Sequence, residues 1–294
     1  MSAASASAPR RDTRGIVDPA ELLTRVRFRR HPPAPELRPY LEHYWLIDWE
    51  LTEPYATHVV PHPSVNVVFQ RYGPLDGPPD TAESSAEVSG IGLGLFTQKL
   101  TGLGRVCGVQ FRPGGFRPFA PAWPVSTWTG RRIPLTKVFP TNEAGGTGEG
   151  TDALSAVLFP DGDHARVAAL DAFLLAHGPT PDPAAEQAME LVDLIRTDRG
   201  LRRVSRLAAA SGLSARSLQR LFAACVGVGP KWVILRYRIH EALERAESAG
   251  TAGAPDWALL ADELGYSDQA HLVRDFTATI GVPPTAYARA VSAP

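Results

Sequence analysis

The chain has 294 residues, of which 44% are hydrophobic and 21% charged, and its formal net charge is −1. A chain of this length is expected to form about two domains with buried cores, which excludes a wholly disordered protein. No apolar run approaches the roughly 18 residues of a membrane-spanning helix, and residues 1–15 lack the apolar segment of a signal peptide. Cys107 and Cys225 lie too far apart for a CxxC-type zinc site, so we expect a reduced, cytoplasmic protein.

The first half of the chain has the pattern of a β-rich domain. Short segments rich in Val, Trp, Tyr and Phe and bounded by Pro or Gly predict strands at residues 42–51, 57–60, 64–71 and 105–111. A loop rich in Pro and Gly covers residues 73–79. We therefore expect a disordered tail at residues 1–19 and one β-rich domain, a small barrel or sandwich, at residues 20–140.

The next segment predicts a flexible joint followed by helix. Residues 142–150 contain four glycines, and residues 151–177 have the apolar spacing of a helix. Residues 141–183 are thus expected to form a hinge and helical connector. From Pro183 onward helix follows helix without a strand signal, which predicts an all-α domain at residues 184–291. The fold class is α+β multidomain, with a β-rich N-terminal domain and an all-α C-terminal domain.

The C-terminal domain contains an internal repeat. Leu207, Gly212 and Ser214 recur 53 residues later, whereas Leu218 and Phe222 recur 54 residues later, so the second copy has one extra residue at its helix start. Each copy has the layout of a helix-turn-helix, in which the glycine supplies a left-handed turn and the serine the N-cap of the second helix. The alternative is a pair of helical hairpins that serves only packing.

A scaffold helix and a basic block accompany the repeat. Residues 231–248 have helical spacing without a breaker and predict a helix of about 27 Å, near the ~34 Å between successive major grooves. Residues 199–240 contain eight arginines, one lysine and no acid, whereas residues 241–294 contain eight acids and three arginines. A basic block of this kind is typical of a surface that binds polyanions, with a solvated helix face as the alternative.

Helical spacing turns Leu218 and Phe222 toward the core and leaves other side chains of the first copy facing outward. Arginine can pair with guanine and glutamine with adenine in the major groove. The predicted base contacts are Arg216, Gln219 and Arg220 in the first copy and Gln269, Ala270 and Arg274 in the second. The predicted phosphate contacts are Arg202, Arg203, Arg206, Ser214, Lys231, Ser267 and His271, with ordinary surface charge as the alternative for the arginines.

Residues 264–276 combine a Gly265-Tyr266 turn with a polar helix, and a Gly-x-x-Pro-x-x-Tyr tail runs from Gly281 to Tyr287. On these motifs, residues 186–291 resemble the DNA-binding domain of the AraC/XylS transcription regulators. The resemblance implies two helix-turn-helix units, a linker helix and base contacts from the six residues named above. Since Ala270 cannot read a base by hydrogen bonds, specificity is expected to rest mainly on the first unit.

Residues 62–69 and 109–115 resemble parts of an uncharacterised N-terminal domain attached to actinobacterial AraC-type regulators, a resemblance that covers roughly residues 25–140. It implies a β-rich sensor or assembly domain and no particular ligand. Candidate residues for an effector pocket are Trp45, His62, Phe69 and Phe111, with plain core packing as the alternative.

Catalysis and metal binding have little support in the sequence. His43, His58 and His62 lie on or beside predicted strands, but they lack the His-x-His spacing of a cupin enzyme, so no metal or cofactor is expected. The motifs G-x-S-x-G and H-E-x-x-H do not occur.

The sequence therefore predicts a non-enzymatic, sequence-specific DNA-binding transcription regulator that reads promoter DNA through two successive major grooves. Its expected partners are double-stranded DNA, a small-molecule effector, a second copy of the chain and, for an activator, RNA polymerase; no membrane is expected. Two alternatives stay open. One is an effector-independent DNA-binding protein whose N-terminal domain only dimerises, and the other is a metal-binding β-barrel enzyme domain fused to a regulator.

Overall fold

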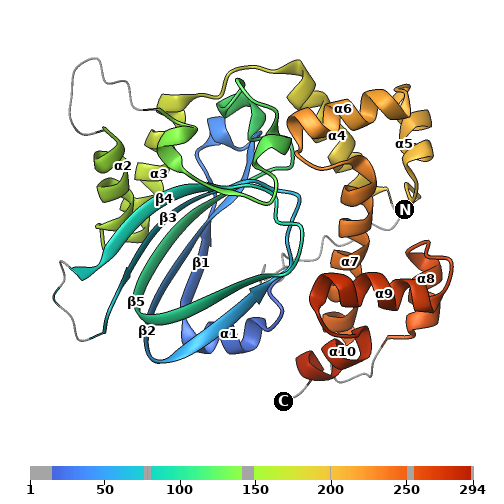
Figure 1. The fold of residues 1–294 in the computed structure, drawn as a ribbon, viewed down its shortest axis with the longest axis horizontal. Coiled ribbons are helices and arrows are strands. Elements are labelled where there is room, and N and C mark those ends of the chain that lie inside the picture. Colours follow the sequence, from blue (N-terminus) through green and yellow to red (C-terminus); the bar gives the residue numbers. More distant parts are fainter. Residues whose placement is uncertain are drawn as a thin grey trace, which may run out of the picture.

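The computed structural model describes residues 15–75, 78, 81–140, 149–198, 200–249 and 255–292. Within them, a β-rich N-terminal domain is followed by a wholly helical C-terminal region (Figure 1). Residues 1–14 of the predicted tail, residues 141–148 of the predicted hinge and Arg199 of the basic block lie outside the described residues. No single helix in the described ranges is long and apolar enough to cross a membrane, although the helices α6 (Ala215–Cys225) and α7 (Pro230–Ala249) pass that test together as a bent pair.

The N-terminal domain is built on one six-stranded antiparallel sheet with the order β1-β2-β5-β3-β4-β6. Its strands are β1 (Arg27–His31), β2 (Leu41–Val59), β3 (Asn66–Gly73), β4 (Glu83–Ser89), β5 (Phe96–Phe111) and β6 (Arg132–Pro134), and helix α1 (Pro19–Arg25) precedes β1. The expected β-rich fold is confirmed. The two segments predicted at 42–51 and 57–60 belong to the single strand β2, whose pairing with β5 shifts register between Leu51 and Tyr55.

The register of the strands separates two faces of the sheet, because successive side chains point to opposite sides. Trp45 pairs with Gly108, and Gly108 pairs with Val68, so these positions share one face. A Cβ at Gly108 would lie only 2.0 Å from the Trp45 indole, so only glycine leaves room for that ring. Phe69 pairs with Cys107 and therefore points to the opposite face.

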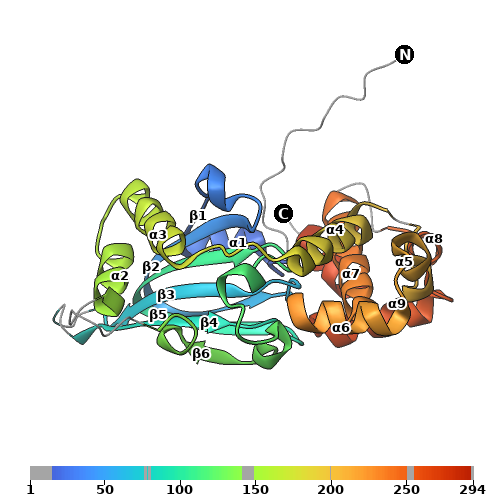
Figure 2. The ribbon, with the colours of Figure 1, turned by 90° about the horizontal axis from the view of Figure 1, so that it is seen from above.

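Helices α2 (Glu149–Leu158) and α3 (Asp163–His177) cover the face that carries Phe69 (Figure 2). The ring of Phe69 meets that of Phe173 edge to face at 5.6 Å, and Leu170 and Leu174 are buried in the same core. The stretch with helical spacing at 151–177 is thus two helices, separated near Pro160, where proline lacks the amide that a continuous helix needs.

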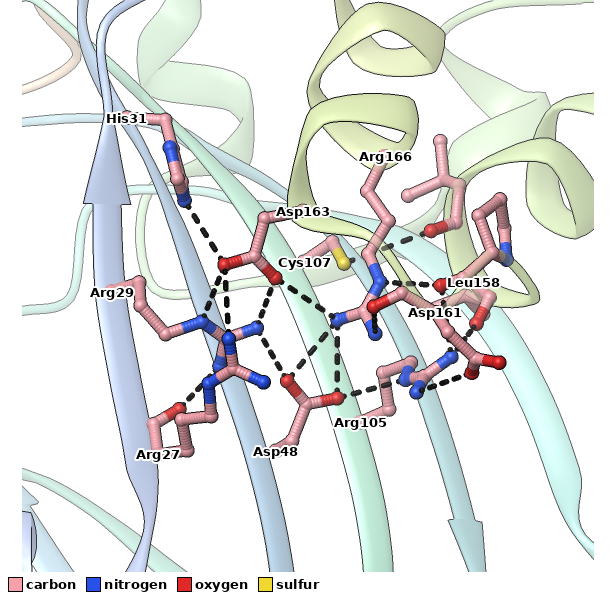
Figure 3. A network of polar contacts seen from close by, with 12 residues as sticks. Arg27, Arg29, His31, Asp48, Arg105, Cys107, Leu158, Asp161, Asp163 and Arg166 are labelled. Atoms are coloured by element: carbon pink, nitrogen blue, oxygen red, sulfur yellow. Dashed lines mark hydrogen bonds and ion pairs between the residues drawn. The ribbon is translucent and has the colours of Figure 1, made fainter.

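An ionic network fastens α3 to this face of the sheet (Figure 3). The Arg166 side chain, in a residue only 1% exposed, donates to both carboxylate oxygens of Asp48 at 3.1 Å. Arg29 bridges Asp48 at 2.6 Å and Asp163 at 2.5 Å. Hydrogen bonds from Arg29 hold the pKa of Asp163 below its ordinary value. Burial alone would raise the pKa of Asp48, but the hydrogen bonds from its arginines outweigh burial and lower it.

Seven helices form the C-terminal region that the structure describes, beside one end of the sheet in both views (Figures 1 and 2). They are α4 (Pro183–Thr197), α5 (Val204–Ser211), α6 (Ala215–Cys225), α7 (Pro230–Ala249), α8 (Trp257–Glu263), α9 (Gln269–Ile280) and α10 (Pro284–Ser292). Helices α5 and α6 form the first helix-turn-helix unit and α8 and α9 the second. The linker helix expected at 231–248 matches α7 to within one residue at each end.

Two hydrophobic cores tie the C-terminal helices to the sheet domain. One core runs without a break from the sheet through α4 into the first unit, where Leu218 and Phe222 are fully buried. The second unit has its own core around Phe276, which Val60 of the N-terminal domain joins. The sheet domain therefore contacts both helix-turn-helix units, and the first more extensively.

Candidate nucleic-acid interface and an adjoining cavity

The first unit has the local geometry that its sequence predicts. Gly212 lies in the left-handed region at φ +68°, which lets α5 end and the chain turn sharply into α6. The Ser214 hydroxyl accepts a hydrogen bond from the Ser217 amide at 3.1 Å and so caps the helix. Leu218 and Phe222 are buried against the core, which fixes the side of α6 that faces solvent.

The outward side of α6 carries the three predicted base-contacting residues of this unit. Arg216, Gln219 and Arg220 are all exposed within the first two turns of the helix. In the part of the chain that the structure describes, neither guanidinium forms an ion pair. At the start of an exposed helix, the two arginine side chains can donate hydrogen bonds to guanine, and the glutamine amide can pair with adenine, in a major groove.

The second unit repeats this geometry with one change at the helix start. Gly265 has φ +75°, and the N-cap of α9 is Asp268, whose carboxylate accepts the His271 amide at 2.7 Å. Asp268 is 54 residues after Ser214, so the extra residue of the second copy moves the N-cap from the repeated serine to the aspartate. Gln269, Ala270 and Arg274 are exposed, as the sequence predicts.

Helix α7 holds the two exposed helices apart. It has 20 residues, which corresponds to about 30 Å at 1.5 Å per residue. Figure 1 shows α6 and α9 near opposite ends of α7, and Figure 2 shows both on the same side of it. Two helices placed in this way can enter successive major grooves on one face of a duplex.

The predicted phosphate contacts differ in whether their side chains are exposed or already form hydrogen bonds within the protein. Arg203, Arg206 and Lys231 are exposed and can reach a phosphate. The hydroxyl of Ser214 is engaged in the cap of α6. Ser267 and His271 bond to each other at 3.2 Å at the start of α9.

Arg202 has a role that differs from the predicted phosphate contact. Its guanidinium donates to the carbonyl oxygens of Asp262 at 3.1 Å and Glu263 at 2.5 Å, at the end of α8. A Cβ at Gly265 would lie 2.2 Å from the Arg202 side chain, so the arginine packs directly on the turn of the second unit. The carbonyl ends of a helix attract cations. Arg202 therefore joins the two helix-turn-helix units, which sequence reasoning could not show because the partners are about 60 residues away.

The basic block is not one continuous surface. Arg236 is only 6% exposed, stacks over Trp232 at 4.4 Å and donates to the Leu93 carbonyl of the N-terminal domain at 3.3 Å. Burial lowers the pKa of Arg236 to about 10, which leaves it a cation at neutral pH. Arg238 lies over the Tyr266 ring at 5.5 Å. These two arginines hold parts of the protein together, Arg236 as a buried side chain and Arg238 as a partly exposed one.

A cavity of about 490 Å³ lies between the sheet and the C-terminal helices. Trp45 and His62, two of the four predicted pocket residues, line it. Phe69 and Phe111 do not, since both are 0% exposed in the core behind the sheet. The prediction that Phe69 and Phe111 line the pocket is therefore wrong. Strand register decides which face a side chain points to, and residue type alone does not reveal it.

The cavity is also lined by residues that the sequence did not single out. Ile195 of α4, Tyr237 and Arg238 of α7 and Leu264 after α8 form its C-terminal wall. Alternation along β2 turns Ile47 and Trp49 toward the cavity beside the predicted Trp45, and that period of two was the available signal.

The described residues contain no group of three His, Cys, Asp or Glu side chains placed to hold a metal ion. His62 packs instead against His240 of α7, with ring centroids 5.6 Å apart. Cys107 and Cys225 are buried, and burial raises the pKa of each thiol to about 11. Both are therefore protonated at neutral pH and poorly suited to nucleophilic chemistry.

Two family models match separate parts of the chain. Residues 29–134 match a domain of unknown function, DUF6597, and residues 207–290 match a helix-turn-helix domain. No curated protein matches the chain. Among solved structures, ToxT from Vibrio cholerae at 1.65 Å resolution is similar, with 10% identity, a TM-score of 0.41 and coverage of 85% of this chain and 98% of that one. Unsaturated fatty acid bound ToxT is 13% identical, with a TM-score of 0.41 and coverage of 88% and 96%.

Proposed function

We propose that this chain, which carries an AraC-type helix-turn-helix domain behind a DUF6597 domain, reads promoter DNA by sequence through two successive major grooves. The observation that carries the proposal is the placement of α6 and α9 on one side of α7, each with an exposed first turn. A regulator of this kind acts through binding and needs no catalytic group.

The two units contribute unequally to base recognition. Arg216, Gln219 and Arg220 give α6 three side chains that can hydrogen-bond base edges. Helix α9 offers Gln269 and Arg274, while Ala270 can make only apolar contacts. The first unit therefore supplies most of the specificity, and the second adds affinity and fixes the register on the duplex.

The exposed cations beside α5 and at the start of α7 contact the phosphate backbone of the DNA. Arg203 and Arg206 precede and lie on α5, and Lys231 begins α7. Each can neutralise a phosphate, which makes the affinity depend on salt concentration. If the protein is an activator, it is also expected to contact RNA polymerase. Neither this contact nor pairing of two chains is assigned to a particular surface.

The N-terminal domain supplies a site for a small-molecule effector. The cavity between sheet and helices has the size of a ligand pocket and contacts both domains. This feature favours an effector over a domain that only dimerises, because a dimerisation domain requires no cavity.

Capture of genomic DNA tests the proposed function. Sheared DNA from the source organism is incubated with the full-length protein at near-physiological salt, and bound fragments are sequenced. We expect a few fragments from upstream of genes to be enriched, and the double variant Arg216→Ala/Arg220→Ala to lose this enrichment. The matched control Arg245→Ala, which removes a cation from the C-terminal half of α7, should retain the enrichment. Uniform capture of all fragments would contradict sequence-specific regulation.

A further inference from the structure

The cavity and the link between the two helix-turn-helix units share a residue. Arg202 lines the cavity and also donates to the carbonyl oxygens of Asp262 and Glu263 at the end of α8. Arg238 lines the cavity too, and it donates to the Arg202 carbonyl while stacking over Tyr266 of the second unit. A molecule in the cavity therefore touches the residues that set the position of one unit against the other.

The inner end of the cavity is apolar and aromatic. Trp45, Trp49, Val68, Leu100 and Val106 line it on the sheet side. Polar atoms of the tryptophans are already engaged. The Trp45 indole donates to the Asn66 side chain at 3.3 Å, and the Trp49 indole donates to the Thr101 carbonyl at 3.2 Å.

Neutral groups also dominate the polar part of this inner wall. The Tyr72 hydroxyl donates to Gln70 at 2.8 Å, and the Gln70 amide donates to Ser85 at 3.0 Å. An ionised ligand buried here would lose its water, and Arg132 of the same domain is already engaged by the Glu87 carboxylate. An uncharged ring system loses little hydration and gains contact with two indoles.

Charged side chains line the cavity from both domains, three from the sheet and seven from the C-terminal region, and their signs balance. Five arginines and five acids line the cavity: Arg30, Arg132, Arg196, Arg202 and Arg238 with Glu42, Asp198, Glu241, Glu244 and Glu263. Arg132 is paired with Glu87 at 2.9 Å. A lining with balanced charge gives no net attraction for either an anion or a cation.

We propose that the cavity binds an uncharged, largely apolar, ring-containing molecule, and that Arg202 transmits its binding to the spacing between α6 and α9. This proposal rests on the proposed function for its effect on DNA, but the ligand class does not depend on that function. Arg202 acts as a positioning residue: it changes how the units are set against each other and does not itself read a base.

Two fluorescent dyes with the same ring skeleton test the ligand class. N-phenylnaphthylamine is neutral, and anilinonaphthalene sulfonate carries a negative charge. We expect the neutral dye to saturate the full-length protein at one molecule per chain, with the sulfonate binding at least about tenfold more weakly. Equal or tighter binding of the sulfonate, or no saturable binding of the neutral dye, would overturn the proposal.

Energy transfer from tryptophan locates the bound neutral dye. Trp45 lines the cavity, whereas Trp123 is 61% exposed on a loop elsewhere. Trp45→Phe should reduce the dye emission excited through tryptophan by clearly more than the matched variant Trp123→Phe does. The opposite pattern would place the dye outside the cavity and reject the site.

The role of Arg202 is tested on a DNA site selected by the wild-type protein, and on versions with one or two base pairs added between its half-sites. The neutral dye should change the relative affinities of the wild type for these spacings by at least about threefold, a measurable shift in binding free energy. At a dye concentration that saturates the variant, Arg202→Ala should tolerate the added base pairs and show no effect of the dye on spacing.

Arg203→Ala is the matched control, because it removes a neighbouring cation that does not reach α8. It should weaken binding equally at every spacing and keep the response to the dye. A dye that leaves the spacing preference of the wild type unchanged would overturn the link through Arg202. A protein that selects no DNA site would instead refute the proposed function, and the dye titrations would still decide the ligand class.

Discussion

The Thr129 hydroxyl donates a 2.7 Å hydrogen bond to the carbonyl oxygen of Gly227, shortly after the end of helix α6. Gly227 is buried at φ +97°, and a Cβ there would come within 2.6 Å of Ile91 of the N-terminal domain. The end of α6 is therefore held by the sheet domain as well as by its own unit. Through this contact a change in the N-terminal domain can reach helix α6.

Thr129→Val removes this donor while keeping the shape of the side chain. The Gly227 carbonyl would lose its partner in a partly buried site, so we expect the free energy of unfolding to fall by about 1–2 kcal/mol. Urea unfolding measures the loss. Thr127→Val, which changes an exposed threonine in the short helix (Val125–Trp128) that Thr129 directly follows, should alter stability by less than about 0.5 kcal/mol. Equal effects would show that the hydrogen bond contributes nothing.

The two turn glycines differ in what surrounds them. Gly212 has φ +68° with open space around it, whereas a Cβ at Gly265, at φ +75°, meets Arg202. Gly212→Ala should therefore cost only about 1 kcal/mol of conformational strain, and Gly265→Ala should cost more. In an Arg202→Ala background the excess should disappear, which a double-mutant cycle by thermal unfolding can measure. An excess that persists would mean that Arg202 does not pack on this turn.

Replacement of the exposed arginines ranks the two units. Arg220→Ala should cost about 1–3 kcal/mol at one base position and relax specificity there. Arg274→Ala should cost less, because α9 presents the weaker set of side chains. Binding to a panel of single-base variants of the site measures both. A uniform loss across the panel for Arg220→Ala would assign this residue to the DNA backbone, and equal losses for the two variants would contradict the ranking.

Acid should loosen the contact between α3 and the sheet. The pKa values of Asp48 and Asp163 are lowered in the folded protein, so their ion pairs stabilise it above about pH 4. This contribution is lost as the pH falls below the ordinary aspartate pKa of 3.8 toward the lower folded values. Asp163→Asn should reduce the dependence of unfolding free energy on pH between about 4 and 2.

The control for this experiment is Glu53→Gln, which removes an exposed carboxylate of β2. Its stability should keep the wild-type dependence on pH in the same range. A wild-type slope in Asp163→Asn would show that the ionic network in Figure 3 does not govern acid stability.

Local signals in the sequence were sufficient to predict the helix-turn-helix units. Gly212 and Ser214 specify a turn and a cap through their own backbone and hydroxyl, and Leu218 and Phe222 mark the buried side of α6. The change of repeat offset from 53 to 54 already indicated an altered helix start. The structure identifies it as a cap by Asp268.

Features that depend on distant partners could not be predicted in the same way. Strand β4 was missed because Glu83–Ser89 is rich in Ser and Glu and lacks clear alternation. Phe69 was assigned to the pocket by residue type, but its pairing with Cys107 turns it to the other face. Arg202 was assigned to phosphate by its charge, although its partners at the end of α8 come together with it only in the folded chain.

The most direct measurement of the central claim is selection of bound DNA from a random pool by the full-length protein at two salt concentrations. We predict an enriched motif with two half-sites about one helical turn apart, more strongly defined in the half read by α6. Raising the salt should weaken binding without changing the motif, since phosphate contacts carry no sequence information. Failure to enrich any motif, with binding that vanishes at moderate salt, would contradict sequence-specific reading and leave only a nonspecific basic surface.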